Sequence, residues 1–255
     1  MRQWSGLLKK EWALMNIAFY ITVGVAIIFT VMIPLSNRIF NWGIEFLEIM
    51  IGVSIQWMML GAGIPIVVFF ISLANEMKRS DIWLHSTASI YKLFGSKAAF
   101  AGSVGAINTI IVLIVNAVGL VVSGIPFGPT FTSISLLFTM LYMLSLLILC
   151  IGSFGAVLFQ LINSYAKRLV APTLLLLFFI SMWLINKITT MKFIQEIKGF
   201  GPIRGPSEGV YHFGEDFFIE IDALVFYMGD IFMGLVVGVL FFIAAAKLFE
   251  KKVRL

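Results

Sequence analysis

The residues that could carry catalysis or bind a metal are few and lie far apart in the sequence. His85 and His212 are the two histidines, Cys150 is the single cysteine, and no Cys, His or acidic group has the short spacing of a metal site. The segment Gly95-Ser96-Lys97 lacks the upstream glycine and the Lys-Ser/Thr pair of a phosphate-binding loop. We therefore expect no catalytic residue, no metal and no cofactor in this chain.

Polar side chains inside the apolar stretches are mostly amides and hydroxyls. The amides are Gln56, Asn108, Asn116, Gln160, Asn163 and Asn186. Hydrogen bonds from such groups stabilise helix pairs in membranes by about 0.6–2 kcal/mol each. Asp230 is the one carboxylate expected within a span, and its place in the first turns favours a role at a helix start. A proton-coupled or ion-conducting mechanism would need buried charges or paired broken helices, and the sequence indicates neither.

The composition determines which elements position these groups. Apolar residues make up 60% of the 255 residues and charged residues 12%, against roughly 45–50% and about 25% in a soluble domain. A soluble fold could not bury that excess, whereas a lipid bilayer accepts it. The sequence therefore predicts an all-α membrane protein, and the net charge of +5 is interpreted as a topology signal rather than as affinity for nucleic acid.

Charge-free stretches give the number of spans, because a charge at mid-bilayer costs about 2.5–3.5 kcal/mol on insertion scales. The intervals Glu11–Arg38 and Glu48–Glu76 contain no internal charge, and the charge-free stretch Ala98–Ala166 is long enough for two passes around a turn at 123–129. The first stretch exceeds the apolar region of a signal peptide and is expected to be retained. The six predicted spans, in one membrane domain, are 17–36, 51–74, 99–122, 133–162, 169–186 and 225–246.

Lysine and arginine set the orientation. With the N-terminus in the cytoplasm, thirteen of the eighteen Lys and Arg residues fall on the cytoplasmic side, while nine of the thirteen acidic residues fall outside. Cytoplasmic loops of membrane proteins carry the excess of Lys and Arg. We therefore predict that both termini are cytoplasmic.

Residues 1–15 are amphipathic. Trp4 and Trp12 share a broad apolar face, and Lys9 and Lys10 lie elsewhere on the helix. Tryptophan prefers the headgroup layer and lysine the anionic inner leaflet, which favours an interfacial helix on membrane lipids that turns into span 1. An ordinary flanking segment with positive charges is the alternative.

Two longer segments lie outside the spans. The cytoplasmic loop, residues 75–92, carries apolar side chains around a helix that Ser80 or Asp81 could cap, and this surface either docks a partner or rests on the inner leaflet. The outer segment, residues 190–224, is acidic, and its apolar spacing predicts two short amphipathic helices around a Gly/Pro-rich turn at 199–209. A solvated acidic cap is the alternative for the outer segment.

The order of these parts, including the basic tail 244–252, resembles the ABC-2 type permease family over essentially the whole chain. Glu76–Lys97 is similar to the segment with the coupling helix, although Ala88-Ser89-Ile90 stands where many members have a Pro-Ile/Val-Ser step. The resemblance implies two permease chains, identical or paralogous, around a lateral cleft, with two cytoplasmic ATPase subunits that bind ATP and Mg²⁺. It assigns ATPase coupling to Glu76, Asp81, Trp83, Leu84, His85 and Tyr91, with Trp4, Lys9, Lys10 and Trp12 on the interfacial helix.

The resemblance also implies export across the bacterial cytoplasmic membrane by a chain that is not itself an enzyme. The cleft would be lined from spans 1, 2 and 5, with Gln56, Met59, Met182 and Asn186 as candidates. Methionine-rich walls suit an amphipathic or hydrophobic cargo, such as a drug or a peptide toxin of the phenol-soluble modulin kind. A membrane scaffold or assembly factor without transport is the alternative, although it gives no reason for the apolar cytoplasmic loop.

Overall fold

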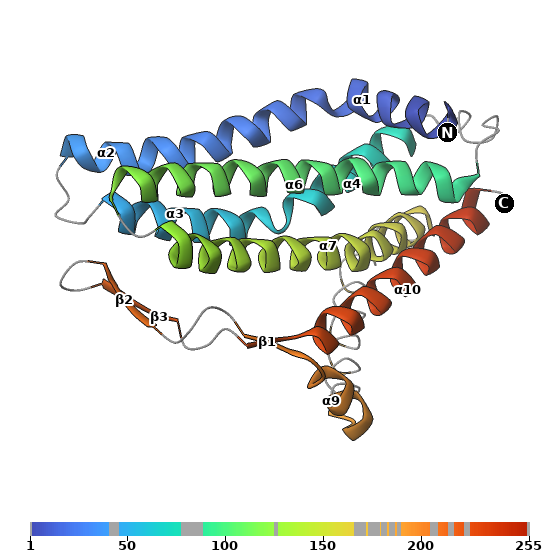
Figure 1. The fold of residues 1–255 in the computed structure, drawn as a ribbon. Helices are drawn as coiled ribbons and strands as arrows, with labels where there is room; N and C mark the ends of the chain where they lie inside the picture. Colours follow the sequence, from blue (N-terminus) through green and yellow to red (C-terminus); the bar gives the residue numbers. More distant parts are fainter. Residues whose placement is uncertain are drawn as a thin grey trace.

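Figure 1 shows the computed structural model, which describes residues 2–40, 46–77, 89–124, 127–165, 190–204, 209–213, 217–221 and 225–253 and the single positions 172, 179, 183 and 187. In this part of the chain five helices are long and apolar enough to cross a membrane: Gln3–Asn37, Phe46–Glu76, Ile90–Val122, Thr130–Ile162 and Met228–Lys251. They confirm the prediction of a helical protein with several membrane-length spans. The predicted span 169–186 lies outside the described residues apart from three single positions.

The first helix is continuous from its start to the end of the first span. α1 (Arg2–Ile27) passes through a π-helical stretch, η1 (Ile28–Met32), into α2 (Ile33–Phe40). The expected turn between a helix at 1–15 and span 1 is therefore not found, because α1 has no break there. Lys10 and Glu11 instead contact the neighbouring helices, so the first turns pack along the bundle. Their contact with the membrane surface stays a prediction.

The second span consists of two helices. α3 (Phe46–Gly61) and α4 (Ile64–Met77) are separated by a turn at Ala62 and Gly63. Pro65 lies in the first turn of α4 and has no N–H group to donate, which explains why the helix breaks just before it. The hydroxyl of Ser145, on α7 (Phe127–Tyr165), donates to the carbonyl oxygen of Ala62 at 2.9 Å. The predicted span 51–74 lies within the membrane-length stretch Phe46–Glu76, and the break in its middle was not predicted.

α6 (Ile90–Val122) lies beside α3 and α4 (Figure 1). Amide side chains inside the spans join it to α3. The indole Nε1–H of Trp57 donates to Asn108 Oδ1 at 2.9 Å. About two turns further along α6, Asn116 Nδ2–H donates to Ser54 Oγ, also at 2.9 Å. Both bonds join α3 to α6, which confirms for these two asparagines the prediction that amides bridge helices.

The apolar interior has two separate cores. The helix α10 (Met228–Val253) ends at the same end of the bundle where α1 begins, here termed the inner end (Figure 1). The first core lies toward this inner end and includes Phe69, Phe94 and Phe249, with ring centroids of Phe94 4.9 Å and 5.9 Å from those of Phe69 and Phe249. The second core holds side chains of α3, including Met50, together with Phe138 of α7. The broken second span therefore contributes α4 to one core and α3 to the other.

The segment before α10 differs from the two short helices that the sequence predicts. α9 (Lys192–Lys198) is the first of them, but β1 (Pro202–Arg204) pairs antiparallel with β4 (Val225–Tyr227), and β2 (Gly209–Phe213) pairs antiparallel with β3 (Phe217–Ile221). The run Phe-Phe-Ile-Glu-Ile forms β3 because aromatic and β-branched residues favour strands. Asp230 lies in the first turn of α10, as expected, and its carboxylate pairs with Lys198 at 3.2 Å.

Candidate functional site

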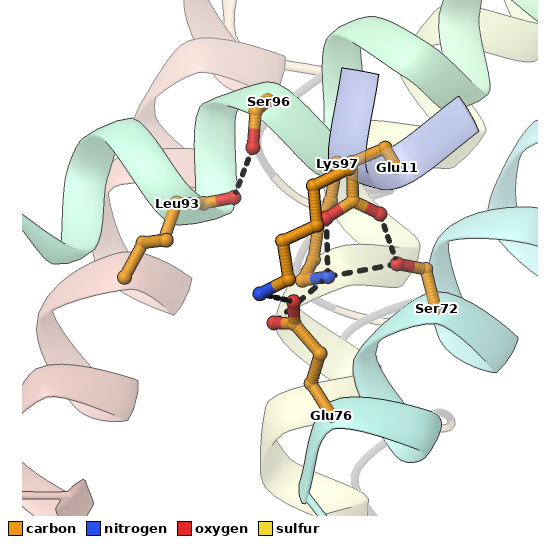
Figure 2. Close-up of polar contacts among 7 residues, drawn as sticks. Glu11, Ser72, Glu76, Leu93, Ser96 and Lys97 are labelled. Carbon is orange, nitrogen blue, oxygen red and sulfur yellow. Dashed lines mark hydrogen bonds and ion pairs between the residues drawn. The ribbon is translucent and has the colours of Figure 1, made fainter. Parts of the chain in front are cut away.

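Five side chains from three helices meet inside the inner end of the bundle (Figure 2). They are Lys10 and Glu11 of α1, Ser72 and Glu76 of α4, and Lys97 of α6, and together they are termed the charge cluster. Three of the four charged members, Glu11, Glu76 and Lys97, border the charge-free stretches that define the spans, and Lys10 directly precedes Glu11. Consecutive spans run in opposite directions, so these borders all come to the same end of the bundle.

Lys97 lies at the centre of the charge cluster. An ammonium group has three N–H donors, and the Lys97 Nζ finds Glu11 Oε1 at 2.8 Å, Ser72 Oγ at 2.8 Å and Glu76 Oε2 at 2.9 Å. Its side chain is fully buried, with 0% exposure. Three oxygens therefore surround this buried cation, two through hydrogen bonds and Glu76 Oε2 through an ion pair, and two of the three belong to carboxylates.

The two carboxylates of the charge cluster have further donors. The hydroxyl of Ser72 donates to Glu11 Oε2 at 2.5 Å, and the Lys10 ammonium pairs with Glu76 Oε1 at 2.5 Å. Glu11 and Glu76 are 2% and 6% exposed, whereas Lys10 is 37% exposed, so the cluster reaches the surface only through Lys10 among its members. With two acids and two bases the cluster is charge-balanced, which is the condition for burying ions at tolerable cost.

Apolar side chains cover the charge cluster on its inner sides. Met15, Leu73 and Phe94 are buried beside it in the first core. Such surroundings exclude water, which strengthens the electrostatic contacts and raises the cost of leaving any one of them without a partner. The cluster therefore holds α1, α4 and α6 together through buried ion pairs.

The charge cluster lies at both ends of the segment 78–88. Glu76 is next to Met77, the last residue of α4, and Lys97 follows the start of α6 at Ile90 by about two turns. The chain between these helices is the loop for which the sequence predicts partner docking. Within the described residues, no group of His, Cys, Asp and Glu side chains could hold a metal ion. The charge cluster thus joins α1 to the two helices that flank this segment.

Two members of the charge cluster, Lys10 and Glu76, were predicted from the sequence as functional residues but not as neighbours. Glu11 marked only a span boundary, Lys97 entered only the comparison with a phosphate-binding loop and the end of the coupling segment, and Ser72 was not noted. One signal could have identified them. Consecutive predicted spans carry residues of opposite charge at their ends on the same side of the membrane. A charged residue that ends an apolar stretch is thus a candidate ion-pair partner as well as a boundary marker.

Other predicted coupling and interfacial residues line the surface around the same end. The ring of Trp4 packs over Gly95 of α6, and the Lys92 ammonium donates to Gln3 Oε1 at 3.1 Å. Tyr91 is 41% exposed in the first turn of α6. These contacts form a second connection between α1 and α6 on the outer side of the charge cluster.

The remaining site predictions are only partly described by the structure. Both Lys9 and Trp12 face outward from α1, away from the charge cluster. Gln56 and Met59 lie on the exposed side of α3, apart from the charge cluster. The predicted coupling residues Asp81, Trp83, Leu84 and His85 and the cleft residues Met182 and Asn186 lie outside the described residues.

Comparison with known proteins gives no further assignment. No protein-family model matches the chain, and no curated protein and no solved structure matches it. What the chain does has therefore to be inferred from its own residues and contacts.

Proposed function

We propose that this chain is the membrane-spanning permease subunit of an ATP-driven exporter whose ATPase is a separate polypeptide. The observation that supports this proposal is the charge cluster, because it fastens the N-terminal helix to both helices that flank the 78–88 loop. In the proposed assembly two permease chains, identical or paralogous, stand on two ATPase subunits on the cytoplasmic side.

The proposed mechanism is mechanical. A partner that presses on the 78–88 loop acts first on the end of α4 and the start of α6. The ion pairs from Lys97 to Glu11 and Glu76 make α1 follow the same movement, because separating them would strand buried charges. Three helices would therefore move as one body when ATP binding closes the ATPases beneath them.

The energy source is placed outside the chain for two reasons. The sequence contains no phosphate-binding loop. The charge cluster also lies at one end of the bundle, and Asn108 and Asn116, further along α6, make their contacts through amides. A path for protons across the membrane would need ionisable groups along its length.

The surface next to the 78–88 loop is suited to a protein partner. Trp4 is 39% exposed and Tyr91 is 41% exposed, and both flank the Gln3–Lys92 contact. Exposed aromatic side chains beside polar groups are typical of the centres of protein interfaces. This surface and the loop together form the proposed docking face for the ATPase.

The experiment is co-purification of the full chain in detergent with any ABC-type ATPase that a neighbouring gene encodes. We expect a stable complex that is lost in Tyr91→Glu and Trp83→Glu, because each change places a charge on the proposed docking face. Tyr227→Glu is the matched control, since Tyr227 is a 37% exposed tyrosine just before α10, away from that face. Absence of an ATPase complex, or a complex that ignores the first two changes, would instead favour the scaffold or assembly factor.

The proposed cargo is an amphipathic or hydrophobic molecule, with an amphipathic peptide as the specific hypothesis. Gln56 and Met59 lie together on the exposed side of α3, where they offer one amide and one adaptable apolar side chain to a neighbour. Export of labelled amphipathic peptide should fall in cells that lack the gene. Unchanged peptide efflux after the deletion would exclude this cargo while leaving the ATPase complex as a separate test.

A further inference from the structure

A shallow groove runs along the outward face of α1 near the inner end of the bundle. Its volume is about 560 Å³, and it is lined by Ser5, Leu8, Lys9 and Trp12 of α1 and by Phe100 of α6. We propose that this groove binds an anionic phospholipid of the cytoplasmic leaflet, with its phosphate at Lys9 and its acyl chains along the aromatic side chains below. The proposal concerns a site separate from the docking face and does not depend on transport.

The groove combines polar residues, Ser5 and Lys9, with apolar residues, Leu8, Trp12 and Phe100. Residues 5, 8, 9 and 12 lie on one face of a helix, since they are separated by three and four positions. The three consecutive charged residues Lys9, Lys10 and Glu11 do not all point the same way. Lys10 and Glu11 turn inward to the charge cluster, whereas Lys9 is exposed and has no ion-pair partner among the described residues. Its positive charge is therefore available to an outside ligand.

Aromatic side chains continue from the groove along α1. The ring of Trp12 lies 6.3 Å from Phe100, 5.1 Å from Phe19 and 6.3 Å from Tyr20, measured between centroids. Trp12 is 43% exposed and Tyr20 is 62% exposed. Trp12 and Tyr20 are eight positions apart, which is about 12 Å along the helix and enough to accompany the upper part of an acyl chain. Tryptophan prefers the headgroup layer, so its place between lysine and apolar surface matches a lipid's polarity.

The chemistry of the groove selects a lipid over the other anions that could approach Lys9. One exposed ammonium and one hydroxyl, that of Ser5, hold a free phosphate weakly in water, because exposed ion pairs contribute little. A phospholipid adds contact with Leu8, Trp12 and Phe100 to the same charge pairing. The groove also lies on a membrane-length apolar helix, where lipids are the neighbouring molecules. One lysine near an anionic leaflet corresponds to a preference of about fivefold for anionic over zwitterionic lipid.

The test uses the full chain reconstituted in phosphatidylcholine vesicles. A small, equal fraction of brominated phosphatidylglycerol or brominated phosphatidylcholine is added, and quenching of tryptophan fluorescence is measured. The difference between the native chain and Trp12→Phe isolates the signal of Trp12 from that of the other five tryptophans. We expect the brominated phosphatidylglycerol to quench this signal at about fivefold lower content than the brominated phosphatidylcholine.

Variants of Lys9 decide the outcome. Lys9→Gln should remove the preference, Lys9→Arg should keep it, and Lys247→Gln should leave it unchanged because Lys247 is an exposed lysine of α10. Unchanged thermal stability of Lys9→Gln shows that the fold is intact. Equal quenching by the two lipids, or a preference that survives Lys9→Gln, overturns the proposal. A preference abolished by millimolar inorganic phosphate at constant ionic strength would assign the site to free phosphate and also overturn it.

Discussion

Replacing Lys97 by methionine gives the most direct test of the charge cluster. Methionine keeps much of the length of the lysine side chain but removes the ammonium group. Glu11 then loses its cation and keeps only the hydroxyl of Ser72, at 2.5 Å from its Oε2. Glu76 loses one cation but keeps Lys10. The change therefore leaves one carboxylate buried without an opposite charge.

The size of the effect follows from that difference between the two carboxylates. Removing one partner of a buried ion pair costs about 3–5 kcal/mol, because the remaining charge cannot be solvated. Glu11 is 2% exposed, so we expect Lys97→Met to lower the free energy of unfolding by that amount. Lys10→Met should cost about 1 kcal/mol or less, since Lys10 is 37% exposed and Glu76 keeps Lys97.

The measurement is the free energy of unfolding of the purified chain in mixed detergent micelles, obtained by titration with a denaturing detergent. Lys92→Met is the matched control, because Lys92 is an exposed lysine of the same helix with one contact, to Gln3. We expect the control to stay within about 0.5 kcal/mol of the native chain. A loss for Lys97→Met no larger than for Lys92→Met would show that Lys97 is not held between two buried carboxylates.

A second variant separates loss of charge pairing from loss of fit. Adding Glu11→Gln to Lys97→Met removes the stranded carboxylate, while Glu76 keeps Lys10. The double variant should recover most of the lost stability, because replacing both members of a buried pair is often close to neutral. If the double variant is as unstable as Lys97→Met alone, the loss comes from packing rather than from the unpaired charge.

Three further substitutions test other parts of the structure through the same unfolding measurement. Asn108→Leu leaves the buried indole N–H of Trp57 without its acceptor and should cost about 1–3 kcal/mol, and a smaller loss would argue against that bond. Ser145→Ala leaves the carbonyl of Ala62 unpaired at the helix break and should cost about 0.6–2 kcal/mol, whereas no loss would mean that the break needs no side-chain donor. In Gly229→Ala the added Cβ would overlap a backbone carbonyl at the end of α9, which should cost about 1–3 kcal/mol. The displaced α9 should also be cleaved faster by a protease. Unchanged cleavage there would contradict the close approach of the two segments.

The sequence predicted the number and place of the described spans well because charge is so costly in a bilayer. The stretch between Glu11 and Arg38 and the stretch after Lys97 could hardly be anything but spans. The break before Pro65 was missed because an apolar count ignores a missing N–H group. The strand Phe217–Ile221 was missed because aromatic residues three to four apart also fit a helix.

The charge cluster shows a different limit of prediction from sequence. The charge pattern puts Glu11, Glu76 and Lys97 at the same end of their spans, and the structure brings them together there. Which of them pair depends on how far each helix continues past the membrane and on its rotation about its axis. Lys9 and Lys10 are adjacent in the sequence, yet only Lys10 turns inward to Glu76. Rotation of this kind is set by packing in the first core, which a charge count does not contain.

The interruption at Ala62 and Gly63 divides the second span between the two cores. α4 contributes Phe69 and Leu73 to the first core, and α3 contributes Met50 to the second. α6 and α7, by contrast, pass unbroken through both cores, since α6 contributes Phe94 to the first and Leu120 to the second, and α7 contributes Leu149 and Phe138. The two ends of the bundle therefore stay tied together by these continuous helices, although one span between them is interrupted.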